Sequence, residues 1–211
     1  MEDRPANITG HKYISDDPDA IAADGVVLEW TYNHTSKQTS ASTYRELFRV
    51  GMADYGHTIR EISFNRYAKP GDEDYGLLYI THGDGSDQSA TAGGGQRNDA
   101  LGKILRINPL LSGSNPYTIP SSNPFVNDDN WLDEIYSLGY RNPHTICFGK
   151  DNNDKVHIVV GEAGRDNFEE INIVLKGGDY GWSEREGTYV HFNAGGGIKN
   201  GIGALPDDNV K

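Results

Sequence analysis

Short segments rich in Val, Ile, Tyr and Phe place the strongest constraint on the fold of this chain. β-Branched and aromatic residues favour strands, and the Gly, Asn, Asp and Pro residues that bound each segment favour tight turns. Closely spaced strands with little helix indicate an all-β sandwich, barrel or propeller. The predicted strands are residues 25–30, 44–50, 58–64, 77–81, 103–107, 135–138, 145–148, 156–160, 171–175 and 188–192.

Three local patterns refine this picture. Residues 60–64 and 103–107 each mix polar and apolar side chains, which is typical of half-buried strands. We expect one short helix over residues 17–23, with Asp17 as its N-cap and Pro18 at its first position.

An internal repeat favours the propeller among these folds. One copy begins at His57 and ends in a Gly-acid turn at Asp84, and the other begins at His144 and ends in such a turn at Glu162. Each copy reads strand, acidic turn, strand and Gly-acid turn, which is typical of repeated four-stranded units. The copies lie farther apart than one blade of about 40–50 residues. A Ser-, Asn-, Pro- and Asp-rich stretch at 112–130 explains the excess as a long loop insertion.

The charge of the chain excludes several classes of partner. It carries 31 acidic and 19 basic residues, for a formal net charge of −12. This balance repels phosphate backbones and anionic membranes, so we expect no nucleic-acid partner. No apolar stretch approaches the roughly 18 residues of a spanning helix, so we expect no membrane span. The acidity either maintains solubility or includes carboxylates that hold a cation such as Ca²⁺.

Two further features concern the cellular compartment. Cys147 lies in an apolar, strand-like run, and we predict a buried structural thiol there. The first residues contain neither the basic region nor the apolar region of a secretory signal peptide, so no export signal is expected in this chain.

Two residues near strand ends suggest acid–base chemistry if a propeller brings them together. His57 begins a predicted strand, where a side chain can point into a central channel. Asp84 lies between two glycines, in a tight turn that we expect to expose its carboxylate. An imidazole base oriented by a carboxylate suits proton abstraction near neutral pH. A histidine satisfied by backbone groups and an ordinary turn aspartate are the alternatives, and His82 is expected to be structural.

A second candidate pair is Arg141 and Asn142. Both stand at a strand end, directly before a proline that restricts the turn. A planar guanidinium together with an amide suits anionic or quinonoid oxygens. The alternative is a surface arginine beside a capping asparagine.

A third group of residues has the composition of a calcium site. Gly164 and Arg165 precede Glu169 and Glu170, and a distinctive Gly-Gly-Asp-Tyr-Gly-Trp run follows, ending at Trp182. Carbonyls exposed at a glycine turn and nearby carboxylates are oxygen ligands that Ca²⁺ prefers. An ordinary acidic loop would have the same composition, so both interpretations remain open.

These residues together resemble the soluble, pyrroloquinoline-quinone (PQQ)-dependent glucose and aldose sugar dehydrogenases, the glucose/sorbosone dehydrogenase family. The resemblance rests on Gly-Lys-Ile-Leu-Arg-Ile-Asn at 102–108, on Leu-Gly-Tyr-Arg-Asn-Pro-His at 138–144 and on residues 170–182. It covers roughly residues 50–190 and implies a six-bladed β-propeller. It also implies PQQ and Ca²⁺ at the mouth of the central channel and a periplasmic or extracellular location.

The resemblance also implies a role for each candidate residue. His57 would take the proton of a sugar's anomeric hydroxyl while hydride passes to the quinone, and Asp84 would support it. Arg141 and Asn142 would contact the quinone, with Arg141 stabilising negative charge on the reduced cofactor. The resemblance implies two calcium sites as well. The carbonyls of Gly164 and Arg165 would bind the cofactor's Ca²⁺, and the Glu170 side chain and the Tyr180 carbonyl would bind a second, structural Ca²⁺.

The length of the chain departs from this family. The basic residues that clamp the quinone's carboxylates in the family would lie beyond Lys211, so residues 1–211 would form a partial propeller of central blades. The implied function of the full-length parent is oxidation of a sugar at its anomeric carbon, with an unknown sugar and electron acceptor. The alternative is a non-catalytic, calcium-stabilised propeller that binds carbohydrate or protein.

Overall fold

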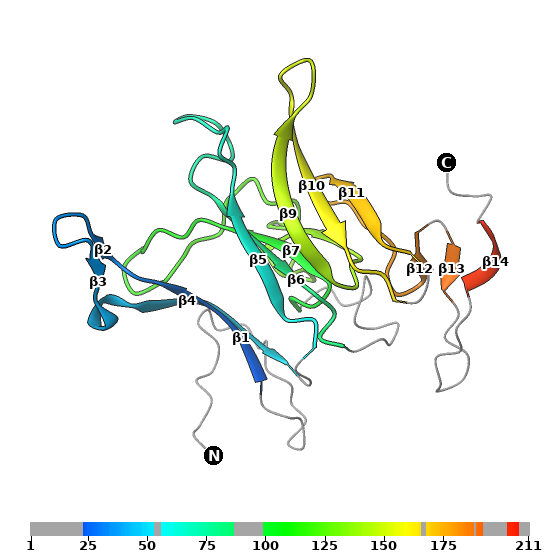
Figure 1. Ribbon diagram of the computed structural model, residues 1–211, viewed down its shortest axis with the longest axis horizontal. Helices are drawn as coiled ribbons and strands as arrows, with labels where there is room; N and C mark the ends of the chain where they lie inside the picture. Colours follow the sequence, from blue (N-terminus) through cyan, green and yellow to red (C-terminus); the bar gives the residue numbers. More distant parts are fainter. Residues whose placement is uncertain are drawn as a thin grey trace.

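The computed structural model describes residues 23–52, 56–86, 99–165, 168–187, 189–191 and 202–206, and strands dominate these residues (Figure 1). The predicted all-β class is therefore confirmed, and each predicted strand overlaps an observed one. The helix expected at 17–23 lies outside the described residues except for its last position, which begins the first strand. The elements are β1 (Ala23–Glu29), β2 (Tyr32–Asn33), β3 (Gln38–Thr39), the 3₁₀ turn η1 (Ala41–Thr43), β4 (Arg45–Met52), β5 (Ile59–Phe64), β6 (Leu78–His82), β7 (Lys103–Ile107), β8 (Ile135–Leu138), β9 (Pro143–Lys150), β10 (Val156–Glu162), β11 (Glu170–Val174), β12 (Arg185–Glu186), β13 (Tyr189–His191) and β14 (Ile202–Pro206).

The central element is a four-stranded antiparallel sheet in the order β5-β6-β7-β8. It lies between the β1–β4 pair and a three-stranded sheet in the order β11-β10-β9, so that sheets stack along the chain (Figure 1). A further small sheet, β12-β13-β14, follows. Neighbouring blades of a propeller stack in the same way. In the part of the chain that the structure describes, the sheets remain separate and do not close into a ring.

Two apolar clusters hold the central sheet between its neighbours. On one face, Leu78, Ile80 and Leu105 pack against Phe48 and Val50 of β4. The second cluster fills the other face, between the central sheet and the β9–β11 sheet. Its buried members are Tyr79, Ile104, Tyr136, Tyr140, Ile146, Phe148, Ile158, Val160 and Val174. Because both faces are covered, every residue of β6, β7 and β8 is buried.

β7 is consequently more buried than its mixed sequence predicted. Lys103 and Arg106 are both fully buried, so the expectation of a half-buried strand at 103–107 is wrong. The ammonium of Lys103 donates to the Leu101 carbonyl at 2.6 Å. The guanidinium of Arg106 donates to Asp74 at 2.9 Å and to Asn123 at 2.8 Å. These bonds satisfy two cations that would otherwise make burial costly.

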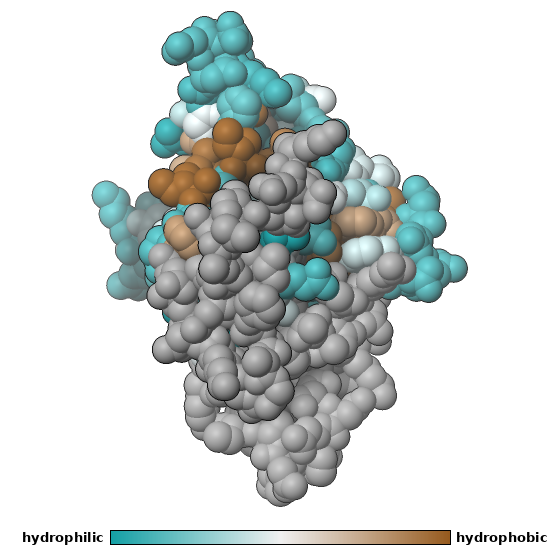
Figure 2. Space-filling model, turned by 90° about the vertical axis from the view of Figure 1, so that its right-hand side faces the viewer, coloured by the Kyte–Doolittle hydropathy of each residue, from teal (hydrophilic) through white to brown (hydrophobic). Residues whose placement is uncertain are grey.

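The outer face of the β9–β11 sheet is open. In its register Val159 lies opposite both Cys147 and Ile173, so these three side chains share one face. Ile173 is 56% exposed and Ile171 is 82% exposed, and Figure 2 shows apolar surface on this side of the molecule. Cys147 is exposed as well, so the prediction of a buried thiol is wrong. Its neighbours in sequence point into the core, and strand alternation turns Cys147 outward.

Two further findings bear on the predictions. The segment 112–130 contains turns and isolated bridges but no strand. Within the described residues, no helix has the length and apolar character needed to cross a bilayer.

Candidate functional site

The candidate site lies at one end of the stacked sheets. His57 lies two residues before the start of β5, and Asp84 lies two residues after the end of β6. Arg141 lies between β8 and β9, and Gly164 follows β10. Trp182 lies beyond β11 and returns to this end because Asp179 forms a parallel bridge with Leu138, the last residue of β8. Because neighbouring strands are antiparallel, the start of each odd-numbered strand and the end of each even-numbered one meet at the same edge. The fold thereby gathers residues far apart in the sequence.

His57 and Asp84 form a close pair at this edge. Nδ1 of His57 lies 2.5 Å from Oδ1 of Asp84, whose side chain is fully buried while that of His57 is 15% exposed. The expected exposure of the Asp84 carboxylate is therefore wrong, because the turn points it inward. Oδ1 also accepts the Ser86 N–H at 3.0 Å, and Oδ2 accepts the indole N–H of Trp182 at 2.9 Å. Since both carboxylate oxygens already accept, we assign the proton of this contact to Nδ1 of His57, which leaves Nε2 as the lone-pair nitrogen.

The backbone around the pair is tightly specified. His57 has a φ of +51°, which L-residues rarely adopt and which is found at functional sites. Gly83 approaches it closely: a Cβ on Gly83 would lie 2.6 Å from the His57 carbonyl oxygen. The Asp84 N–H donates to the Arg141 carbonyl at 2.7 Å, which ties the turn to the next candidate residue.

His82 has no part in this pair. It is fully buried, and its Nδ1 lies 2.6 Å from the Gly83 carbonyl oxygen. Burial lowers its pKa to about 4, so the ring is neutral near pH 7. The predicted structural role of His82 agrees with these contacts.

Arg141 lies beside the pair, with its guanidinium 5.8 Å from the ring centre of Trp182. Its Nη1 donates to the carbonyls of Ala163 at 3.1 Å and Gly164 at 2.8 Å. Its Nε is buried and has no hydrogen-bond partner within the part of the chain that the structure describes. A buried cationic donor of this kind favours an acceptor from a bound anion.

Asn142 is nearly buried and held from several sides. Its Oδ1 accepts from Nε of Arg60 at 2.8 Å, so the amide nitrogen faces away from Arg60. The carboxylate of Glu162 accepts the backbone N–H of Arg141, and its contact with the Asn142 N–H is 3.4 Å. Burial raises the pKa of Glu162 to about 8, and the Arg141 N–H opposes this rise. Arg141 and Arg60 thus place two cations at this end of an acidic chain.

One of the two predicted ligands of the cofactor's calcium, the Gly164 carbonyl, is engaged in another contact. The Gly164 carbonyl accepts from Arg141, and the Arg165 N–H donates to Glu186 at 2.7 Å. A guanidinium at the Gly164 carbonyl would repel a divalent cation at the same oxygen. Among the described residues, no group of three or more His, Cys, Asp or Glu side chains is arranged to hold a metal ion. Because the Arg141 guanidinium occupies the Gly164 carbonyl, that oxygen does not fit Ca²⁺ in this arrangement, and the Arg165 carbonyl stays a predicted ligand.

Glu170 and Tyr180, the predicted ligands of a second calcium, belong to separate contacts. Oε1 of Glu170 accepts the Gly187 N–H at 2.5 Å, and its Oε2 accepts from Asn172 at 3.1 Å. Tyr180 stacks on Tyr140, with ring centres 4.8 Å apart. These two ligand assignments remain predictions.

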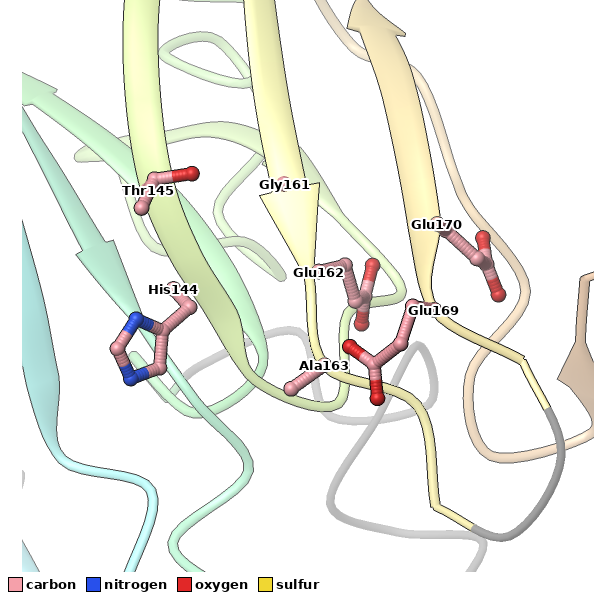
Figure 3. Close-up of a pocket in the computed structure, with 7 residues that line it drawn as sticks. All are labelled: His144, Thr145, Gly161, Glu162, Ala163, Glu169 and Glu170. Atoms are coloured by element: carbon pink, nitrogen blue, oxygen red, sulfur yellow. The ribbon is translucent and has the colours of Figure 1, made fainter.

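An acidic pocket of about 350 Å³ lies next to this edge, between β9, β10 and β11 (Figure 3). Glu162 comes from the end of β10, Glu169 and Glu170 from the start of β11, and His144 from the start of β9. The remaining lining residues are Thr145, Gly161 and Ala163. The carboxylates of Glu169 and Glu170 in this pocket repel an anionic ligand, so the basic His57–Arg141 edge is the better candidate for an anionic cofactor.

The sequence reasoning missed three residues that shape this edge. Glu162 fixes the backbone of Arg141, Arg60 orients Asn142, and Trp182 contacts both Asp84 and Arg141. The run ending at Trp182 was distinctive in sequence, but its partner Asp84 lies 98 residues earlier.

Comparisons with known proteins agree with this description. A family model described as Glucose / Sorbosone dehydrogenase matches residues 14–199. The HIPL2 protein of Arabidopsis thaliana is 35% identical over 182 residues, which cover 78% of this chain and 25% of that protein. Quinoprotein glucose dehydrogenase B of Acinetobacter calcoaceticus is 34% identical over 116 residues, which cover 53% of this chain and 22% of that protein.

The solved structure of the soluble aldose sugar dehydrogenase of Escherichia coli in its apo form is similar as well. It superposes with a TM-score of 0.57 and 25% sequence identity, over 75% of this chain and 40% of that chain. The chain thus spans a quarter or less of the two curated relatives and under half of the solved enzyme. Because the family model matches most of its residues, the chain belongs to the glucose/sorbosone dehydrogenase family.

Proposed function

We propose that this chain forms the proton-abstracting part of a PQQ-dependent aldose dehydrogenase that is periplasmic or extracellular. The observation that carries the proposal is the buried Asp84 carboxylate bonded to His57, with Arg141 at the same edge. The Nε of Arg141, which has no partner among the described residues, fits an anionic quinone oxygen. The name of the Acinetobacter relative, a quinoprotein glucose dehydrogenase, supports the choice of cofactor and of a sugar substrate.

His57 provides the base. Bound PQQ would supply the acceptor for the hydride from C1 of the sugar, which leaves this chain to remove the proton of the anomeric hydroxyl. Nε2 of His57 accepts that proton, and Asp84 stabilises the resulting imidazolium through Nδ1. The sugar loses one hydride and one proton and leaves as the lactone.

Arg141 and Asn142 would bind the quinone oxygen on which negative charge develops. The Ala163 and Gly164 carbonyls anchor the guanidinium of Arg141, so its charge is held in place without a change of rotamer. The amide of Asn142, fixed by Arg60, offers its nitrogen as a neutral donor. A preorganised cation beside developing negative charge lowers the barrier more than a mobile one.

Dye reduction by the full-length protein that contains this chain, supplied with PQQ, Ca²⁺ and a panel of aldoses, tests the proposal. We expect His57→Gln to lower sugar-dependent reduction by roughly 10²–10⁴-fold. The matched control is His157→Gln, because His157 also pairs with an aspartate, Asp151 at 3.0 Å, but lies at the opposite end of β10. Full activity in His57→Gln would exclude His57 as the base.

A non-catalytic propeller that binds carbohydrate or protein is the second candidate. It is favoured by a match to the Hedgehog-interacting protein of Mus musculus, which is 30% identical over 127 residues that cover 56% of this chain and whose name records a protein partner. Sugar binding by calorimetry with no dye reduction at saturating PQQ would support this candidate and contradict the enzyme.

A further inference from the structure

Trp182 contacts both charged parts of the candidate site. Its indole N–H donates to Oδ2 of Asp84 at 2.9 Å, and the guanidinium of Arg141 lies 5.8 Å from its ring centre. The side chain is almost fully buried, at 3% exposure. The proposed mechanism assigns chemistry to His57, Asp84 and Arg141 and leaves Trp182 without a role.

The backbone fixes the indole firmly against the central sheet. The Trp182 N–H donates to the Gly139 carbonyl at 2.9 Å, and the Tyr180 N–H donates to the Leu138 carbonyl at 3.0 Å. Gly139 has a φ of +81°, and a Cβ there would lie 2.1 Å from Oδ1 of Asp179. The loop that carries Trp182 is therefore held along the end of β8.

The indole N–H determines which oxygen of the Asp84 carboxylate faces His57. A fully buried carboxylate oxygen without a donor is costly. If Oδ2 lost its donor, the carboxylate could rotate, and Oδ1 would no longer be held as the acceptor for the Nδ1–H of His57. Without that acceptor the ring could carry its proton on Nε2 instead. That ring could no longer accept a proton from a substrate at Nε2.

We propose that Trp182 is a positioning residue: its N–H occupies Oδ2 of Asp84, so that Oδ1 faces Nδ1 of His57 and Nε2 stays unprotonated toward the substrate. Its ring face also holds the Arg141 guanidinium beside the base. The inference rests on the proposed role of His57 as the base. Trp182 does not itself touch the reacting atoms.

The competing explanation is that Trp182 only packs the core. An aromatic side chain at this position that lacks the N–H distinguishes the two explanations. Trp182→Phe keeps an aromatic face for Arg141 but removes the N–H. Replacement of Trp182 by β-(3-benzothienyl)alanine keeps the shape of the indole, with sulfur in place of N–H, and provides the test if Trp182→Phe fails to fold.

Nitrogen-15 NMR of the imidazole rings at pH 8 reads the tautomer directly. In the wild-type protein we expect the His57 signals of a ring protonated at Nδ1. In either variant we expect an Nε2-protonated or mixed population at His57, with no change at His157. In PQQ-loaded protein we expect kcat to fall roughly 10–100-fold, as for loss of a hydrogen bond to a charged group, with PQQ affinity changed less than about threefold.

The NMR result tests the role of Trp182, and dye reduction tests the dehydrogenase function, so the two can fail independently. A His57 ring that stays protonated at Nδ1 in the benzothienyl variant would overturn the role of Trp182, whatever the activity. A tautomer change at His57 in a protein whose wild type reduces no dye would support the positioning role and contradict the dehydrogenase.

Discussion

Acid should destabilise this protein through His82, a residue outside the candidate site. His82 is fully buried at the end of β6, and burial lowers its pKa from 6.5 to about 4, with the charges of Lys103 and Arg60 acting in the same direction. Between these two pKa values the unfolded chain binds a proton that the folded chain excludes. The stabilising effect of the neutral ring is therefore present above pH 6.5 and is lost as the pH falls toward 4.

The size of this effect follows from linkage. A difference of about 2.5 units corresponds to roughly 3 kcal/mol in the acid limit, of which about 2 kcal/mol develops between pH 7 and pH 5. His82→Asn removes the titrating ring, and an amide N–H can still donate to the Gly83 carbonyl, which lies 2.6 Å from Nδ1 of His82. The free energy of unfolding of this variant should therefore depend less on pH.

Urea unfolding of wild type and His82→Asn at pH 7, 6 and 5 measures the difference. We expect the variant to gain about 2 kcal/mol relative to wild type on going from pH 7 to pH 5. His157→Asn is the control, because His157 is partly exposed and its pairing with Asp151 is at the surface. A difference between wild type and His82→Asn that stays constant within about 0.5 kcal/mol over this range would refute the reasoning.

Three further outcomes follow from the packing. Gly83→Ala should displace His57, because the new Cβ would lie 2.6 Å from its carbonyl oxygen, and we expect a loss of about 1–3 kcal/mol by urea unfolding together with lower dye reduction; unchanged values in both assays would contradict this contact. Ile104→Ala should cost about 2–5 kcal/mol because its side chain is fully buried, whereas Leu110→Ala, at a site 70% exposed, should cost under about 0.5 kcal/mol; equal costs would contradict the described core. Exposed Cys147 should react with a disulfide reagent in the folded protein as fast as in urea-treated protein, and strong protection would place it in the core instead.

The strands could be predicted because the residues that favour a strand, and the turn residues that bound it, are neighbours in the sequence. β7 and β8 have the predicted bounds, since β-branched and apolar runs between turn residues define them. Sequence could not predict the burial of Lys103 and Arg106, because their partners lie on other segments. The exposure of Cys147 depends on which face of the sheet is covered, and no local pattern carries that information.

The sequence indicated several residues of the candidate site, but it did not indicate which of them contact one another. The Gly-Asp-Gly turn and the Arg-Asn-Pro turn singled out Asp84 and Arg141 from their chemistry. The bond from Trp182 to Asp84 joins residues 98 positions apart, and it depends on the stacking of separate sheets. Likewise, the donation from Arg141 to the Gly164 carbonyl appears only after β8 and β10 are placed at the same edge.

Sugar-dependent dye reduction by PQQ-loaded full-length protein carrying Asp84→Asn tests the His57–Asp84 pair most directly. The substitution leaves the size of the side chain nearly unchanged, removes the carboxylate that fixes Nδ1 of His57, and should lower kcat by roughly 10²–10⁴-fold. Asp151→Asn, at the other histidine–aspartate pair, should leave kcat within about twofold. An Asp84→Asn protein that folds, binds PQQ and oxidises sugar at the wild-type rate would contradict a base built from this pair.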